Sequence, residues 1–259
     1  KLDYIVHEWG TIQLFVKNKL SVVISSNLYE SSRTPLFYIF NKYNPFSYDL
    51  EKLRFFWFIF STTVPFIFYS LLKNINSEKI NKKIILLFAF IIFLSPYFRT
   101  NAFWPSSENL QIFFVILSVF FYYKLINGSW NKIKLYLFSS LSILFAYCAF
   151  YTDQKAFFLV LVIYFDLIRR NNISFFIGFS IINFIFFLPA IYLFIIWEGL
   201  VPYQSQFRVS EYLAGTNILI SSIGIYFALL FLSNIFEKSF RKKIKFNILD
   251  IGIILIFSI

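Results

Sequence analysis

ISFFIGFSIINFIFFLPAIYLFIIW, the stretch from Ile173 to Trp197, contains no Asp, Glu, Lys or Arg. A helix needs about 20 apolar residues to cross the hydrocarbon core of a bilayer, and this stretch exceeds that length. Pro189 lies inside it, and a proline is tolerated in such a helix when neighbouring helices satisfy the carbonyl groups that it frees. The stretch therefore predicts a kinked transmembrane helix.

The composition of the whole chain agrees with this prediction. Apolar residues make up 59% of the 259 residues, charged residues make up 14%, and the mean hydropathy is +0.69. A soluble domain has about 45–50% apolar and about 25% charged residues. The excess cannot be buried in one water-soluble core, so the sequence predicts an all-α polytopic membrane protein. The chain has no Met and stops inside an apolar run, so we expect the bundle to be truncated at both ends.

Further apolar runs lie on either side of this stretch, and together they predict about eight transmembrane helices. The predicted spans are residues 53–72, 84–97, 110–126, 135–151, 156–168, 173–197, 218–236 and 248–259. We accordingly divide the chain into residues 1–51, a first extracytoplasmic loop, and residues 52–259, a bundle of transmembrane helices.

The links between these spans alternate in charge, and this alternation predicts the topology. Basic residues gather in every second link: Lys73, Lys79, Lys82, Lys83, Lys124, Lys132, Lys134, Arg169, Arg170, Lys238, Arg241, Lys242, Lys243 and Lys245. The positive-inside rule places these links in the cytoplasm and residues 1–51 outside. The net charge of +11 is explained by topology, and no nucleic acid is called for. The abundance of Lys, Asn, Ile and Phe suggests a bacterial source, hence an inner (plasma) membrane with the site facing the periplasm or exterior.

The opening segment has a helical pattern of its own. Ile5, Trp9, Ile12 and Val16 recur at the spacing of an amphipathic helix that lies on the membrane surface. Glu8 flanks this apolar stripe. A second interfacial helix is expected directly after Pro35, because proline suits the first turn of a helix.

These residues resemble the integral-membrane glycosyltransferases of the GT-C fold, which use lipid-linked sugars and include the protein O-mannosyltransferases and aminoarabinose transferases. The resemblance covers about the first 170 residues. Its motifs are His7-Glu8, at the position of the family's acidic pair; Arg33-Thr34-Pro35-Leu36-Phe37-Tyr38; Ser95-Pro96-Tyr97-Phe98-Arg99 through to Glu108; and Thr152-Asp153-Gln154-Lys155. Two differences are that His7 replaces the usual first carboxylate and that one proline of a common pair is missing.

The resemblance implies transfer of a sugar from a polyprenyl-phosphate donor to a glycan, lipid or protein acceptor. Such a reaction needs a carboxylate to take the acceptor's proton and cations to stabilise the departing phosphate. Glu8 is the predicted base, Asp3 is its reserve, and His7 is a candidate proton shuttle. The predicted substrate-binding residues are Arg33, Tyr38, Arg99, Glu108, Lys155 and Arg208.

No resident cofactor is expected, because the lipid-linked sugar is a substrate. With one His and one Cys the chain cannot build a His- or Cys-rich metal site, which leaves a carboxylate-only magnesium or manganese site open.

Two other functions fit a chain of this kind. The first is a multi-span transporter or flippase of lipid-linked glycans, although charge inside the spans is scarce. The second is a polysaccharide polymerase or ligase, which would place arginines in a late outer loop, where Arg208 stands. A glycosyltransferase is distinguished from both by the expectation that Glu8 and Glu108 face one cavity.

Overall fold

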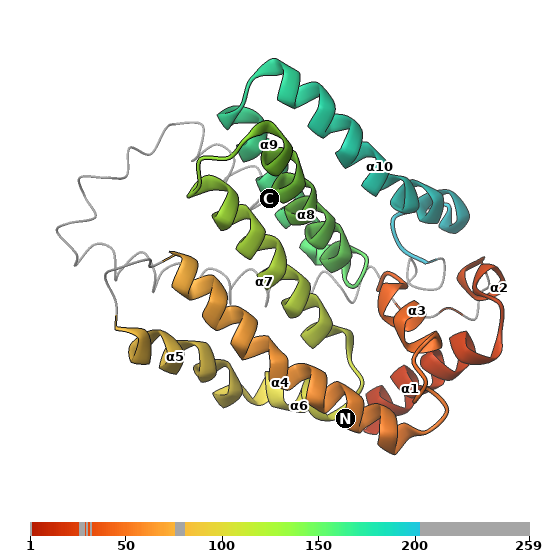
Figure 1. Cartoon of the computed structure of the whole chain (residues 1–259). Coiled ribbons are helices and arrows are strands. Elements are labelled where there is room, and N and C mark those ends of the chain that lie inside the picture. Colours follow the sequence, from red (N-terminus) through yellow and green to blue (C-terminus); the bar gives the residue numbers. More distant parts are fainter. Residues whose placement is uncertain (1, 26–28, 30, 32, 76–80, 203–259) are drawn as a thin grey trace, which may run out of the picture. The chain divides into compact units, whose positions relative to one another are not determined.

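The computed structural model describes residues 2–25, 29, 31, 33–75 and 81–202, and for residues 2–7 it describes the backbone only. These residues belong to a compact unit that spans Lys1–Ser205, and residues 206–259 form a second unit outside the described part. The described residues form helices and no strands (Figure 1). The elements are α1 (Leu2–Lys17), α2 (Leu20–Ser25), α3 (Leu36–Lys42), α4 (Leu50–Ile75), α5 (Lys82–Phe90), η1 (Ile91–Leu94), α6 (Pro96–Phe103), α7 (Ser107–Ile126), α8 (Lys132–Phe150), η2 (Gln154–Ala156), α9 (Phe157–Arg170) and α10 (Ile173–Trp197).

Four of these helices, α4, α7, α8 and α10, are long and apolar enough to cross a bilayer. The pair α5–η1 and α6 is bent by 66° and counts as a fifth span if it crosses as one broken helix. The eight predicted spans are therefore not reached among the described residues. The predicted span 156–168 is the 14-residue helix α9, which is too short for a perpendicular crossing, and the predicted spans 218–236 and 248–259 lie outside the described part.

The outward faces of these helices are apolar. On α10 alone, Ile173, Ile177, Phe184 and Ile195 are each more than half exposed. A soluble protein rarely leaves contiguous apolar surface of this extent in water, so the exposed faces are those of an α-helical membrane protein.

Polar contacts between buried side chains join the long helices. Ser118 Oγ on α7 donates to the carbonyl oxygen of Ser142 on α8 at 2.8 Å, and Ser142 Oγ donates to the carbonyl oxygen of Ser118 at 3.0 Å. Small side chains of this kind let two helix backbones approach closely in a membrane. Asn109 on α7 donates to Ser61 Oγ on α4 at 2.9 Å and to the carbonyl oxygen of Phe98 on α6 at 3.1 Å.

The Tyr151 side chain forms hydrogen bonds with the turn of α10 around Pro189. Proline has no N–H and disrupts the preceding turn of a helix. The Tyr151 hydroxyl enters this turn of α10: it donates to the carbonyl oxygen of Phe186 at 2.6 Å and accepts from the N–H of Ala190 at 3.2 Å. The hydroxyl thus bridges a carbonyl oxygen and an N–H in the turn next to Pro189, whereas the carbonyl group that the proline itself frees is that of Ile185.

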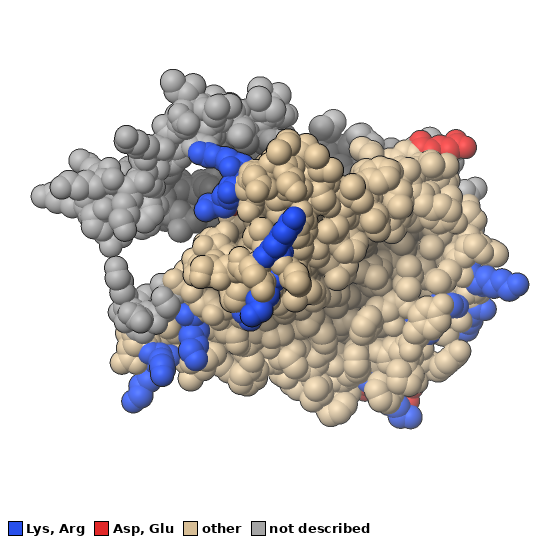
Figure 2. Space-filling view, turned by 45° about the horizontal axis from the view of Figure 1, so that its top comes forward, with Lys and Arg blue, Asp and Glu red and all other residues tan. Residues whose placement is uncertain are grey.

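The described residues that flank the basic links after α4, α7 and α9 lie at one end of the bundle, and the fourth basic link, residues 238–245, lies outside the described part. Asn127 Nδ2 donates to the carbonyl oxygen of Asn74 at 3.5 Å, and Tyr136 Oη donates to that of Ser174 at 3.2 Å, so the links after α4, α7 and α9 are neighbours. Figure 2 shows the described Lys and Arg residues in separate groups, with a broad surface between them that carries neither basic nor acidic residues. This surface has the charge distribution expected of a belt in contact with lipid.

Helices α1, α2 and α3 lie together at the opposite end of the bundle (Figure 1). Their apolar residues, including Ile12 and Val16, form one core with Trp57 of α4 and Trp197 of α10. The predicted helices of residues 1–51 are therefore present, but their apolar stripe packs against protein and not against the membrane surface. The physical reason is that the ends of α4 and α10 offer large aromatic surfaces, which a sequence read locally does not reveal.

Candidate active site

A cavity of about 880 Å³ lies where α1, α6 and the start of α7 meet. Small-molecule sites commonly have volumes of about 300–1,000 Å³. Its walls combine aromatic, hydroxyl, amide and charged side chains, contributed by Glu8, Trp9, Ile12, Arg33, Leu50, Pro96, Tyr97, Thr100, Asn101, Trp104, Pro105, Ser106 and Glu108. The cavity thus offers both apolar surface and charge to a ligand.

Arg33 joins two carboxylates at one wall of this cavity. Its Nη1 lies 3.3 Å from Glu8 Oε1 and donates to Ser107 Oγ at 2.5 Å, while its Nη2 is bonded to Glu108 Oε1. The side chains are only slightly exposed, at 16% for Arg33, 8% for Glu8 and 14% for Glu108. Because a guanidinium presents several donors in a planar fork, one arginine can hold both carboxylates at once. Two acidic residues and one cation are therefore concentrated in a poorly solvated place.

Tyr38 supports Glu8 from the side away from Arg33. The Tyr38 hydroxyl donates to Glu8 Oε2 at 2.8 Å, and it also lies 2.9 Å from Ser31 Oγ. Burial, followed by the charge of Glu8, raises the pKa of Tyr38 well above its usual value, so the phenol stays protonated and remains a donor. Tyr29 is similar: burial and Glu8 raise its pKa, and its hydroxyl donates to the carbonyl oxygen of Arg33 at 2.5 Å.

The run that carries Arg33 is fixed by backbone contacts with α8. Thr34 Oγ1 donates to the carbonyl oxygen of Phe150 at 2.7 Å, and the N–H of Leu36 donates to that of Tyr151 at 2.9 Å. Pro35 directly precedes α3, as the sequence predicted, and α3 then presents Tyr38 to Glu8.

Glu108 is placed by the start of α7. It lies in the first turn of this helix, where the aligned peptide dipoles favour a negative charge. Ser106 Oγ donates to Glu108 Oε2, so each carboxylate oxygen of Glu108 has its own partner. The position of Glu108 is therefore set before any ligand enters the cavity.

The structure brings together four of the residues singled out in the sequence: Glu8, Arg33, Tyr38 and Glu108. Arg99 and Lys155 are exposed and do not line this cavity. Asp3 and His7 belong to the first two turns of α1, but their side chains are outside the described part, as is the whole of Arg208.

Sequence reasoning missed Trp104 and Asn101, which line the cavity from the end of α6 and the link to α7. Trp104 is held by Arg54 of α4, whose guanidinium carbon lies 4.1 Å from the ring centroid. Arg54 Nη1 also lies 3.2 Å from Glu51 Oε1. The aromatic residue before Pro105 was the available signal, but it equally fits an interfacial anchor.

Among the described residues, no group of three or more His, Cys, Asp or Glu side chains is arranged to hold a metal ion. Between Glu8 and Glu108 the compensating charge is supplied by Arg33. No family model, curated protein or solved structure matches this chain.

Proposed function

We propose that this protein is a membrane glycosyltransferase that moves a sugar from a polyprenyl-phosphate donor to an acceptor on the extracytoplasmic side of the membrane. The observation that carries the proposal is the position of Arg33 between Glu8 and Glu108 in one cavity. The predicted acidic residues thus face the same space as a cation suited to phosphate. The GT-C resemblance of the runs that contain Glu8, Arg33 and Glu108 supports the same assignment.

In this proposal Arg33 recognises the phosphate of the donor. A guanidinium binds phosphate and carboxylate with the same planar geometry, so an incoming phosphate can take over the Nη1 donor that now serves Glu8 and Ser107. The exchange frees Glu8 Oε1, which lies 3.3 Å from Arg33 Nη1, to accept a proton. Tyr38 remains on Glu8 Oε2 and keeps the carboxylate oriented.

In the proposed reaction, one bond forms at the anomeric carbon of the sugar while another breaks. The acceptor's oxygen or nitrogen attacks the anomeric carbon of the sugar, the bond from that carbon to the phosphate oxygen breaks, and the phosphate leaves with the bonding electrons. Glu8 takes the proton that the acceptor loses, and Arg33 stabilises the charge on the leaving phosphate. Glu108 keeps Arg33 in place while its other contacts change. The aromatic side chains of Trp9 and Trp104 offer apolar walls to the donor.

We base the proposed side of the membrane on the charges of the links. The cavity lies at the end of the bundle that carries α1–α3, away from the basic links around Asn74, Asn127 and Ser174. The positive-inside rule places those links in the cytoplasm. The cavity would then face the periplasm or exterior, where lipid-linked sugars are used.

The test is transfer of radiolabelled sugar from polyprenyl-phosphate donors in membranes that contain the protein, with Glu8→Gln compared at equal expression. Loss of the base should lower transfer about 10²–10⁴-fold while donor binding is retained. Glu198→Gln is the matched control, because Glu198 is an exposed glutamate after α10 and lies outside the cavity.

Each result has a defined meaning. Unchanged transfer by Glu8→Gln would remove Glu8 from the mechanism and direct attention to Asp3 and Glu108. No transfer by the wild type from any donor would overturn the enzyme proposal. The experiment to follow would then measure flipping of lipid-linked glycans in vesicles, because a flippase is the alternative for a cavity of this kind.

A further inference from the structure

A second pocket, of about 490 Å³, opens where α1 ends and α2 begins. It is lined by residues 16–21 of this region and by Lys42 and Tyr43 at the end of α3, and it shares no lining residue with the cavity around Glu8. Three of its lining residues are lysines, Lys17, Lys19 and Lys42, and none is acidic. A pocket lined by basic residues and no acidic residue favours the binding of an anion.

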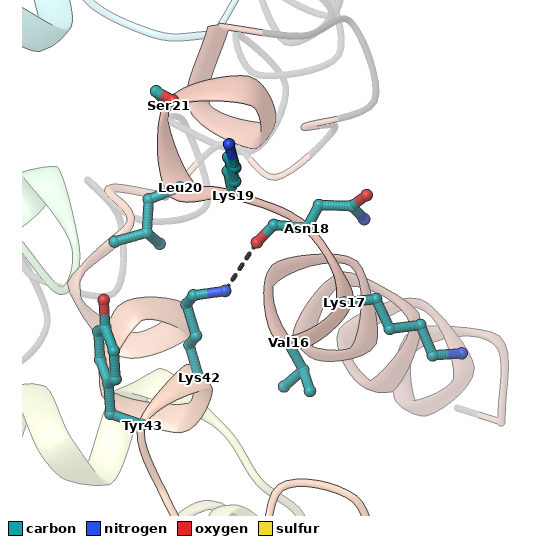
Figure 3. A pocket seen from close by; sticks show the side chains of 8 residues that line it. All are labelled: Val16, Lys17, Asn18, Lys19, Leu20, Ser21, Lys42 and Tyr43. Atoms are coloured by element: carbon teal, nitrogen blue, oxygen red, sulfur yellow. Dashed lines mark hydrogen bonds between the residues drawn. The ribbon is translucent and has the colours of Figure 1, made fainter.

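The three lysines differ in what they contact. Lys42 Nζ donates to the carbonyl oxygens of Phe15 and Asn18, at 2.7 Å each. These carbonyls belong to the C-terminal end of α1, where the helix dipole is negative, so they offset much of the charge of Lys42. Figure 3 shows Lys42 reaching toward Asn18 at the end of α1, Lys19 projecting from the turn, and Lys17 projecting from α1 on the side away from Lys42. Among the described residues, neither Lys17 nor Lys19 forms an ion pair with a carboxylate.

Exposed aromatic and apolar side chains lie near these lysines. Tyr43, which lines the pocket, is 71% exposed, and Val22 of α2 is 56% exposed. Exposed tyrosine beside lysine is typical of the level of the lipid headgroups, where the ring lies at the interface and the ammonium reaches the phosphates. Figure 1 shows α1, α2 and α3, whose ends border the pocket, together at one end of the bundle.

We propose that this pocket binds the phosphate of an anionic phospholipid. Lys17 and Lys19 supply the attraction for the phosphate, and Lys42 holds the end of α1 so that the turn keeps its form. Tyr43 and Leu20 border the lysines and contact the apolar part of the lipid. A bound lipid would tie the helices of residues 1–51 to the bilayer at a point distinct from the Glu8 cavity. The proposal does not depend on the proposed transferase activity.

The test is native mass spectrometry of the purified protein in neutral detergent, titrated with phosphatidylglycerol or with phosphatidylcholine of the same acyl chains. The wild type should retain the anionic lipid preferentially. Each lysine removed should weaken its binding about five-fold, so Lys19→Gln gives one such step and the double variant Lys17→Gln/Lys19→Gln gives two. Lys52→Gln is the control, since Lys52 is exposed, pairs with Asp49 at 3.3 Å and lies outside the pocket.

Three results would overturn the proposal. The first is equal retention of the two lipids by the wild type, which would show that the headgroup charge is not recognised. The second is an equal loss of affinity in Lys19→Gln and Lys52→Gln, which would show that only the total charge matters. The third is displacement of the lipid by millimolar inorganic phosphate, which would make a soluble phosphate the preferred occupant. Circular dichroism and thermal unfolding of each variant separate these results from misfolding.

Discussion

Replacing Arg33 by methionine tests the physical basis of the site most directly. The substitution keeps much of the apolar stem but leaves Glu8 and Glu108 as two poorly solvated carboxylates without their shared cation. At an effective dielectric constant of about 20, attraction over a 3.3 Å separation such as that between Arg33 and Glu8 is about 5 kcal/mol. Removing one partner of a buried ion pair costs about 3–5 kcal/mol, because the remaining charge is buried without compensation. We therefore expect Arg33→Met to lower the melting temperature by roughly 6–20 °C.

The matched variant removes all three charges together, as Glu8→Gln/Arg33→Met/Glu108→Gln. Since an entire buried ionic group can be replaced by neutral residues at little cost, this triple variant should be more stable than Arg33→Met alone by at least about 2 kcal/mol. The assay is thermal unfolding in detergent, followed by tryptophan fluorescence with the wild type alongside. Both variants should have lost sugar transfer. If the triple variant is as unstable as the single one or more so, the cost does not come from uncompensated charge and the electrostatic reasoning fails.

Three further substitutions test the groups around the site and the bundle. Tyr38→Phe removes the hydroxyl that donates to Glu8. Because the pKa of this phenol is raised in the folded protein, the stabilisation that the hydroxyl provides is complete below about pH 10 and is lost as the pH rises further. In chemical unfolding the wild type should therefore lose stability above about pH 10 more steeply than the variant. Tyr151→Phe should cost about 1–3 kcal/mol of stability, because the N–H of Ala190 loses its partner in the turn around Pro189; a loss below about 0.5 kcal/mol would contradict this role. Glu198→Gly should raise stability by about 1 kcal/mol, because Glu198 has a left-handed backbone with φ of 51° that glycine adopts without strain. Glu198→Ala should bring no such gain, and thermal unfolding of both variants measures the difference.

The positions of the helices could be predicted from the sequence better than the residues against which each helix packs. The runs around Trp57, Ile116, Ile143 and Phe184 became long helices, because composition and length alone determine whether a segment can span a bilayer. The break between α5 and α6 was not predicted, although Ser95-Pro96 lies within it and Ser95 caps α6. The spacing of Ile12 and related residues indicated a helix, but it could not show that aromatic residues far along the chain would cover that helix.

The same limit applies to the candidate site. Glu8 was singled out as the predicted base and Glu108 as a predicted substrate-binding residue, and the resemblance in the motifs also directed attention to Arg33 and Tyr38. The residues around Arg33 do not reveal that it contacts both carboxylates, because these partners lie 25 and 75 residues away along the chain. Arg99 looked equivalent to Arg33 in the sequence. The difference is that Arg99 lies on α6 away from the cavity-lining face formed by Tyr97, Thr100 and Asn101, and only helix packing determines which face that is.

The end of α8 explains how the opening segment and the bundle share one site. The main chain there accepts hydrogen bonds from Thr34 and Leu36, which flank Pro35 in the run that carries Arg33. The side chain of Tyr151, from the same place, bonds to the turn of α10 around Pro189. These two contacts use different atoms of Tyr151, since Leu36 bonds to its carbonyl oxygen and α10 bonds to its hydroxyl. Loss of the hydroxyl should therefore weaken α10 and leave Arg33 in place, so the position of Arg33 depends on the backbone of α8 and not on the contact between Tyr151 and α10.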